Sequence, residues 1–383
     1  MWKRPSRVPT QLHGERMNQP WNQLDAALFE RAKTLLDEEW LSRDADLAPL
    51  LPVVLERGVG QDWHKAGTFR HHLAGVARSL ALWRQPWEVR QLGLLHSVYG
   101  NAFVDLVKFD AGNEREQLKR LVGEQAEHLV YLFCTMSRTQ FVQKLLAGEL
   151  GDDGSLQIER NGPEPRETIR LTAYEVAVFA IVSMADSMEQ WFSWQEDIYS
   201  RFPSVDHSRQ QAVHWAASLW PGPMRPSSRM LSQISGLGQA LQHPALKTQL
   251  PLPPVFANCS QLLSAGNEAA AVALYWSVIR LDQPLVDLDA ATATLEQAVA
   301  LNPWVGEPQM VLAQLYLSAG RSADAARAAE SALQCFCTWG NAWDKRVQWD
   351  AWIAWTRILL QSARQDSWPA RLDKLNNMAL NQV

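Results

Sequence analysis

Apolar positions along most of this chain recur with the period of an amphipathic helix. Between Trp21 and Arg57, for example, Leu24, Ala27 and Leu28 follow the i, i+3, i+4 spacing that places side chains on one helical face. The same spacing predicts further helices over residues 64–84, 86–96, 114–134 and 137–149. We therefore predict an all-α fold for most of the chain.

One region departs from this period and predicts a small β-hairpin. Residues 155–159 and 168–171 are short β-prone segments, and the turn residues 161–163 lie between them. Thr172 and Glu175 then form the Thr-x-x-Glu capping box of another helix. Because that helix is apolar on nearly all sides, we expect it to lie at the centre of the fold.

The last third of the chain repeats at a spacing of 34 residues. The positions of Ala291, Leu295, Ala298 and Pro303 recur as Ala325, Ala329, Ala332 and Cys337. With Leu312, Ala313, Tyr316 and Gly320, this pattern is similar to tetratricopeptide repeats. The similarity implies helix pairs near 266–303 and 304–337 and a Trp-rich closing helix near 341–363. Two pairs are too few to be stable alone, so we expect them to pack on the rest of the chain or on the closing helix.

The closing helix carries a stripe of tryptophans. Trp349, Trp352 and Trp355 step by three residues along it. Large aromatic side chains in such a stripe predict a buried seam between helices, and a ligand-binding aromatic wall is the alternative.

A length of 383 residues favours two domains. Prolines become frequent between Phe202 and Phe256, so we place the boundary at the end of that stretch. The predicted organisation is an irregular arm at 1–20, a helical domain at 21–255 and a repeat domain at 256–383.

Composition excludes several classes of partner. The net charge of −5 does not favour a nucleic-acid partner, and no apolar run has the roughly 18 residues of a membrane span. The N-terminus lacks the apolar segment of a signal peptide, and the four cysteines are not spaced as a metal or redox motif. We expect a cytoplasmic protein with no membrane partner.

Three polar residues stand inside otherwise apolar helical segments. His72 precedes Leu-Ala-Gly-Val, His96 follows Gly-Leu-Leu, and Asp186 follows Ser-Met-Ala. Burying imidazoles and a carboxylate costs free energy unless a partner compensates. A shared metal ion is one partner that would account for all three.

At these residues the chain resembles the HD-domain superfamily. Its members place a histidine on one helix, a His-Asp pair on the next and a lone aspartate on a later helix, around a metal. The resemblance covers about residues 64–190 and implies that His72, His96 and Asp186 bind a divalent ion, with iron, zinc and manganese as candidates. Two imidazoles and one carboxylate suit zinc with a bound water, or ferrous iron. Ser97 stands where the superfamily has the aspartate of the pair, which argues against a two-metal cluster and leaves Ser97 as a residue beside the ligands.

Two neighbours are candidates for a catalytic role. His64 lies eight residues before His72, so on a continuous helix the two share a face. His64 is then a fourth ligand or a proton shuttle, or simply a solvated residue at the helix start. Tyr99 follows His96 closely and either reaches the site as an acid or hydrogen-bond donor, or packs in the core.

A polar stripe offers two interpretations. Arg120, Glu124 and His128 recur at steps of four residues, which usually marks a solvated face with an ion pair. If the stripe lines the site instead, Arg120 is an anion-binding catalytic residue, and Glu124 and His128 support the metal.

Three functions follow as hypotheses. The first is a metal-dependent enzyme in which activated water hydrolyses a phosphorylated or related small molecule, as the superfamily resemblance implies. The second is a mononuclear non-haem iron oxygenase that uses His72, His96 and Asp186. The third is a non-enzymatic adaptor whose tetratricopeptide-like part binds a protein partner.

Overall fold

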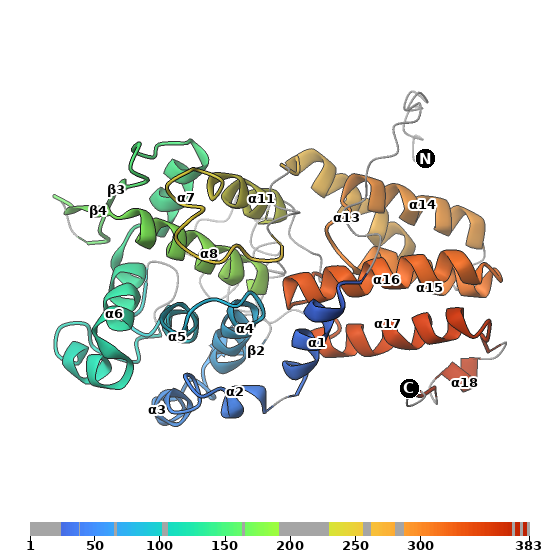
Figure 1. Cartoon of the computed structure of the whole chain (residues 1–383), viewed down its shortest axis with the longest axis horizontal. Coiled ribbons are helices and arrows are strands. Elements are labelled where there is room, and N and C mark those ends of the chain that lie inside the picture. Colours follow the sequence, from blue (N-terminus) through green and yellow to red (C-terminus); the bar gives the residue numbers. More distant parts are fainter. Residues whose placement is uncertain are drawn as a thin grey trace, which may run out of the picture.

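The computed structural model describes residues 24–37, 39–64, 67–101, 106–162, 165–190, 230–255, 262–279, 287–369, 372–375 and 378–380 (Figure 1). The predicted arm at 1–20 lies outside these residues. Most of the predicted proline-rich segment also does, and so does the predicted boundary near residue 256. Among the helices that are described, none is long and apolar enough to cross a lipid bilayer.

The fold is all-α with two short antiparallel hairpins, which confirms the predicted fold class. The strands are β1 (Trp63–His64), β2 (Gly67–Thr68), β3 (Leu156–Glu159) and β4 (Thr168–Leu171). The β3–β4 hairpin is the predicted one, and its register pairs Leu156 with Leu171 and Glu159 with Thr168. The β1–β2 hairpin was not predicted.

The N-terminal part of the chain contributes these helices: α1 (Ala26–Thr34), α2 (Trp40–Arg43), α3 (Leu50–Glu56), α4 (Phe69–Leu82), α5 (Trp87–Leu95), α6 (Arg115–Thr135), α7 (Arg138–Leu146), α8 (Ala173–Gln190) and α11 (Met230–Ala240). The helical pattern at 21–57 is therefore divided among three short helices.

The start of α4 corrects the predicted helix at 64–84. The Thr68 side chain accepts a hydrogen bond from the His71 backbone N–H, and the His71 ring accepts one from the Thr68 backbone. This reciprocal cap satisfies two backbone donors that a helix start otherwise leaves without partners. The helix consequently begins at Phe69, and His64 belongs to the hairpin before it.

Helix α8 occupies the centre of the N-terminal part, as predicted. Every residue from Val176 to Asp186 is buried, and the helix packs against α4, α5 and α11. The predicted capping box is present, because the Thr172 backbone N–H donates to the Glu175 carboxylate and the Glu175 N–H donates to the Thr172 hydroxyl.

In the C-terminal part, five consecutive described helices pack on one another along the chain. These are α13 (Ala265–Ile279), α14 (Leu288–Leu301), α15 (Glu307–Ser318), α16 (Ser322–Trp339) and α17 (Trp349–Arg364). The short α18 (Leu372–Leu375) follows them. Helices lie at the places where the repeat pattern predicted two pairs and a closing helix. The tetratricopeptide likeness itself stays a prediction.

The two parts of the molecule lie side by side, with α1 at their junction (Figure 1). The Asp25 backbone N–H donates to the Gln334 side chain on α16 at 2.7 Å. The buried Trp83 indole donates to the Thr338 carbonyl at 3.0 Å. These contacts agree with the expectation that the repeat region packs against the rest of the chain.

Gly340 ends α16 at this junction. Its φ of 70° lies in the left-handed region that favours glycine, and a Cβ built there would stand 2.8 Å from a methyl carbon of Leu82. A residue without a side chain therefore allows the end of α16 to approach α4 closely.

The tryptophan stripe on α17 is mainly a seam. Trp349 and Trp352 are buried, and their indole N–H groups donate to the carbonyls of Phe336 and Asp344. Trp349 has a second role, because it also lines the pocket described below.

Candidate metal centre

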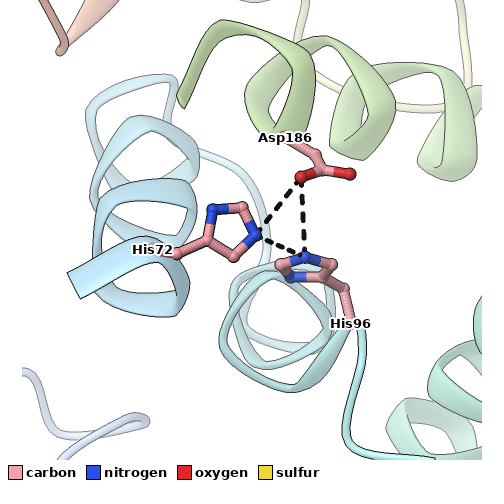
Figure 2. Close-up of side chains that lie close together, drawn as sticks. All are labelled: His72, His96 and Asp186. Atoms are coloured by element: carbon pink, nitrogen blue, oxygen red, sulfur yellow. Dashed lines mark hydrogen bonds and ion pairs between the residues drawn. The ribbon is translucent and has the colours of Figure 1, made fainter. Parts of the chain in front are cut away.

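Three side chains from three helices converge on one buried point (Figure 2). His72 comes from α4, His96 from the residue that ends α5, and Asp186 from α8. The Nε2 atoms of the two histidines are 3.0 Å apart. Asp186 Oδ1 lies 3.3 Å from Nε2 of His72 and 3.6 Å from Nε2 of His96.

These separations match those of ligands around a single ion. Two atoms each about 2.1 Å from a common metal are about 3.0 Å apart at a right angle and about 3.4 Å apart at the tetrahedral angle. The observed 3.0, 3.3 and 3.6 Å fall around these values. No side chain has to move far for all three atoms to contact one cation.

The hydrogen bonds of the other ring nitrogens fix the orientation of both imidazoles. His96 Nδ1 donates to the Gly93 carbonyl at 2.8 Å. That carbonyl lies in the last turn of α5, where carbonyl groups have no partner within the helix. His72 Nδ1 donates to the Glu189 carboxylate, which lies one turn after Asp186 on α8. Ligating histidines in metalloproteins are held by this kind of second hydrogen bond.

Asp186 is anchored from its opposite side. The Arg138 guanidinium at the start of α7 pairs with Oδ2 of Asp186 and lies 4.5 Å from the centre of the Phe133 ring. Oδ1 faces the histidines and accepts a 2.7 Å hydrogen bond from the Gln190 amide. The carboxylate thus presents one oxygen to the centre.

The electrostatics of the cluster stabilise a positive charge at the centre. Burial lowers the pKa of His96 to about 4, with help from the neighbouring charges of His72 and Arg138, so its Nε2 carries a lone pair. Burial also acts to lower the pKa of His72, but the carboxylates of Glu189 and Asp186 outweigh it and raise that pKa to about 9. Burial opposes ionisation of Asp186, yet Arg138 and the two histidines hold its pKa well below the usual value. Without a metal, a proton on His72 supplies the positive charge.

The donor set fits a divalent cation. Two neutral imidazole nitrogens and a carboxylate oxygen are ligands of zinc, ferrous iron and manganese. Such a cation would displace the proton of His72. Nε2 of His72, Nε2 of His96 and Oδ1 of Asp186 would then each offer it a lone pair. The residues present can therefore bind the metal that the sequence predicted, with one carboxylate ligand fewer than the HD-domain pattern.

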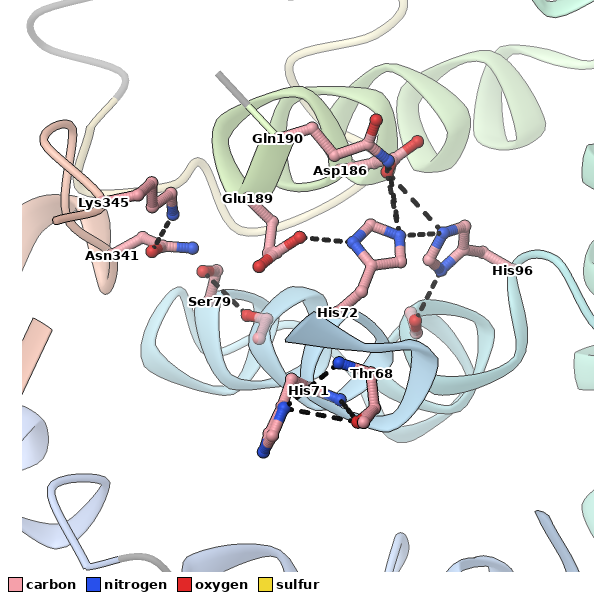
Figure 3. Close-up of polar contacts among 12 residues, drawn as sticks. Thr68, His71, His72, Ser79, His96, Asp186, Glu189, Gln190, Asn341 and Lys345 are labelled. Carbon is pink, nitrogen blue, oxygen red and sulfur yellow. Dashed lines mark hydrogen bonds and ion pairs between the residues drawn. The ribbon is translucent and has the colours of Figure 1, made fainter. Parts of the chain in front are cut away.

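The cluster borders a pocket of about 470 Å³ between the two parts of the molecule. His64, His72, Glu189 and Gln190 line the pocket on the side of the cluster. The wall from α4 and the C-terminal part includes Arg78, Asn341, Lys345 and Trp349. Figure 3 shows Glu189 between His72 and the pair formed by Asn341 and Lys345.

The prediction that His64 shares a helix with His72 is wrong. His64 belongs to β1 and not to the helix of His72. The hairpin nevertheless brings its ring to 4.6 Å from the His72 ring, measured between ring centroids, and His64 lines the same pocket.

Tyr99 and Ser97 form hydrogen bonds with residues outside the cluster. The Tyr99 hydroxyl donates to the buried Glu127 at 2.9 Å, and Arg115 donates to the same carboxylate. Burial and Glu127 raise the pKa of Tyr99, so this hydroxyl is a poor acid. Ser97 is buried and accepts a hydrogen bond from Asn101 at 2.9 Å.

The polar stripe on α6 is a solvated face, and the interpretation that it lines the site is wrong. Arg120, Glu124 and His128 are all exposed. His128 pairs with Glu175 on the surface at 2.9 Å. Gly123 interrupts α6 with a φ of 78°, so spacing by four residues does not describe one continuous helical face.

Several residues of the site were missed by sequence reasoning. Glu189 and Gln190 follow Asp186 by three and four residues, and this helical spacing was a signal that places them on its face. Arg138, Asn341 and Lys345 lie on other elements, and no local pattern connects them to the histidines.

One comparison with known proteins gave a match. Residues 53–138 match the family model of a domain of unknown function, DUF6817. The matched segment contains His72, His96 and Arg138, whereas Asp186 lies beyond it. Neither the curated proteins nor the solved structures gave a match.

Proposed function

We propose that this protein is a mononuclear metal-dependent enzyme that hydrolyses a phosphorylated or related small molecule. One observation carries the proposal: two imidazole nitrogens and a carboxylate oxygen, each fixed by a second hydrogen bond or ion pair, converge beside a pocket. A divalent ion bound there would supply Lewis-acid activation of water at neutral pH.

The side chains of the chain take distinct roles in this proposal. His72, His96 and Asp186 bind the cation, Glu189 orients His72, and Arg138 holds Asp186. His64 is the pocket imidazole next to His72, and we assign proton transfer to it. The superfamily resemblance and the DUF6817 match both include the two histidines, which is consistent with the assignment but does not identify the substrate.

The pocket favours hydrolysis over oxygenation. Its lining is rich in charged and polar groups, and the cationic Arg78 and Lys345 among them suit an anionic substrate. The oxygenase is the second candidate, because two histidines and one carboxylate also form the facial triad of ferrous oxygenases.

Elemental analysis of protein purified with and without oxygen tests the proposal. We expect one divalent ion per chain and a loss of more than about tenfold in metal content for His96→Ala and Asp186→Asn. His128→Ala is the matched control, since it removes a surface imidazole, and it should retain the metal.

Turnover of a panel of phosphomonoesters and phosphodiesters then separates the two enzymes. Hydrolysis that His96→Ala abolishes supports the proposal, whereas oxygen consumption by the ferrous protein favours the oxygenase. Wild-type protein without any bound metal would contradict both and leave the adaptor hypothesis.

A further inference from the structure

The C-terminal part contributes one wall of the pocket beside the candidate metal centre. Residues 340–348 connect α16 to α17. Asn341 and Lys345 from this connection line the pocket together with Trp349, the first residue of α17, and with His72 and Glu189. None of these three C-terminal residues has a role in holding the cation. The presence of these side chains in the pocket wall therefore needs a separate explanation.

Asn341 presents a buried hydrogen-bond donor to this pocket. The residue is only 5% exposed, and its Oδ1 accepts from the Ala342 backbone N–H at 2.9 Å and from the Lys345 ammonium. Its Nδ2 is buried and has no hydrogen-bond partner among the described residues. In Figure 3 this nitrogen lies on the side of Asn341 that is nearer to Glu189 and Ser79. A buried N–H group without an acceptor costs free energy that a ligand oxygen would recover.

Lys345 adds a positive charge next to this donor. Its ammonium carries three N–H groups, and the Asn341 oxygen is its hydrogen-bond acceptor among the described residues. Burial lowers the pKa of Lys345 to about 8, with Glu189 acting in the opposite direction, so the amine is still mainly charged at neutral pH.

Arg78 supplies a second positive charge to the same wall. Its guanidinium lies 4.7 Å from the Trp349 ring centre, and its Nε donates to the Gly340 carbonyl at 3.3 Å. The nearby acidic groups are Glu189, which is already bonded to His72, and Asp350. An arginine held in this way is a preorganised donor for an oxyanion.

We propose that Asn341, Lys345 and Arg78 form a binding subsite for an oxyanion group, phosphate or carboxylate, of the substrate. The C-terminal part thereby completes the pocket and positions the substrate, while the other end of the substrate faces His72. This second statement rests on the proposed metal-dependent function, but the subsite itself binds its oxyanion without the metal.

Calorimetric titration of the full-length protein tests the subsite. Orthophosphate and, separately, acetate are titrated at constant ionic strength into protein stripped of metal by a chelator. Asn341→Asp keeps the oxygen that bonds Ala342 and Lys345 but replaces the donor with a second acceptor. Lys345→Met removes the charge and keeps most of the length of the side chain. Lys247→Met is the control, because Lys247 is exposed after α11 and does not line the pocket.

We expect each pocket variant to weaken oxyanion binding by about tenfold or more, as loss of a hydrogen bond to a charged group does. The control should bind like the wild type, and thermal unfolding should show that all variants fold. Preferential binding of orthophosphate or of acetate tells which oxyanion the subsite takes. No binding of either by the wild type, or equal affinity in wild type and both pocket variants, overturns the subsite.

Metal content, measured in the same preparations before chelation, separates the two proposals. Unchanged metal in Lys345→Met together with weaker oxyanion binding supports the subsite as independent of the ion. Oxyanion binding that depends on Lys345 in a protein that never contained metal supports the subsite and contradicts the metal-dependent function.

Discussion

Two buried polar clusters of this molecule are built in opposite ways. In the N-terminal part, Nε2 of His72, Nε2 of His96 and a carboxylate oxygen of Asp186 face one common point. In the C-terminal part, the buried carboxylates of Glu307 and Asp344 receive donors. The Trp343 and Asp344 backbone N–H groups donate to Glu307 at 2.6 and 3.0 Å, and the Tyr275 hydroxyl donates to Asp344 at 2.8 Å.

The comparison shows which kind of buried cluster calls for a ligand. In both clusters charge is removed from water, but in the second the Arg346 ion pair and the Tyr275 hydrogen bond offset this cost at Asp344. The first needs a positive charge between its atoms, which a proton on His72 or a bound cation would supply. We therefore interpret the C-terminal cluster as structural and the N-terminal cluster as a candidate binding site.

The largest effect is expected for Asp344→Ala. Removing this carboxylate leaves the buried Tyr275 hydroxyl and Arg346 without their partner, so we expect a loss of about 3–5 kcal/mol in the free energy of unfolding. Urea unfolding should give the same loss with and without added metal. Asp289→Ala, an exposed position on α14, should change the stability by less than about 1 kcal/mol. A loss that metal restores would mean that the second cluster is not purely structural.

The second-largest effect is expected when a chelator removes the proposed cation. A ligand present at about one hundred times its dissociation constant stabilises the folded state by about 2.7 kcal/mol, so a chelator should lower the melting temperature of the wild type correspondingly. His96→Ala should show no such response, while Glu307→Gln should respond like the wild type. If the melting temperature of the wild type is the same with and without the chelator, the assignment of a metal site to His72, His96 and Asp186 is wrong.

Glu307→Gln should change how stability depends on pH. Burial raises the pKa of Glu307 to about 7 from its ordinary value of 4.5, so the folded protein holds this proton more tightly than the unfolded chain does. The contribution of this group to stability is then fully present below about pH 4.5 and decreases by about 1.4 kcal/mol per pH unit as the pH rises toward 7. The glutamine variant cannot ionise, so it should be more stable than the wild type by about 2 kcal/mol at pH 8 and equal to it at pH 5. Chemical unfolding at several pH values measures this difference. If the stabilities of the wild type and of Glu307→Gln depend on pH in the same way, this account of the C-terminal cluster is wrong.

The smallest effect is expected for Glu189→Gln. The glutamine still reaches His72, but the carboxylate that accepts its Nδ1–H is lost, and such changes weaken metal binding by about tenfold, or 1.4 kcal/mol. Competition with a metal indicator measures the affinity, with His128→Ala as the control. An unchanged affinity would show that Glu189 does not orient the ligand.

Much of the N-terminal fold followed from local patterns. Pro86 marks the start of α5, the turn at 161–163 marks the β3–β4 hairpin, and Thr172 marks the start of α8. His72, His96 and Asp186 could be selected because polar residues in apolar helices need a shared partner. Their convergence within 4.8 Å agrees with that argument.

The failures have equally local causes. Strands of two residues, such as β1 and β2, are too short to show alternation, so the start of α4 was placed too early. The left-handed Gly123 breaks a helix whose pattern otherwise seemed continuous. Arg138 meets Asp186 across 48 residues, and Lys345 enters the pocket from the other part of the chain, so only tertiary packing relates them to the site.

The absence of a side chain at Gly340 affects the width of the pocket. The residue immediately precedes Asn341, and its carbonyl holds the Arg78 guanidinium, so the distance between Leu82 and this backbone controls how deeply both polar groups enter the pocket. A larger side chain at position 340 would push α16 away from α4, because it would contact Leu82. It would change the width of the pocket while leaving His72, His96 and Asp186 in place.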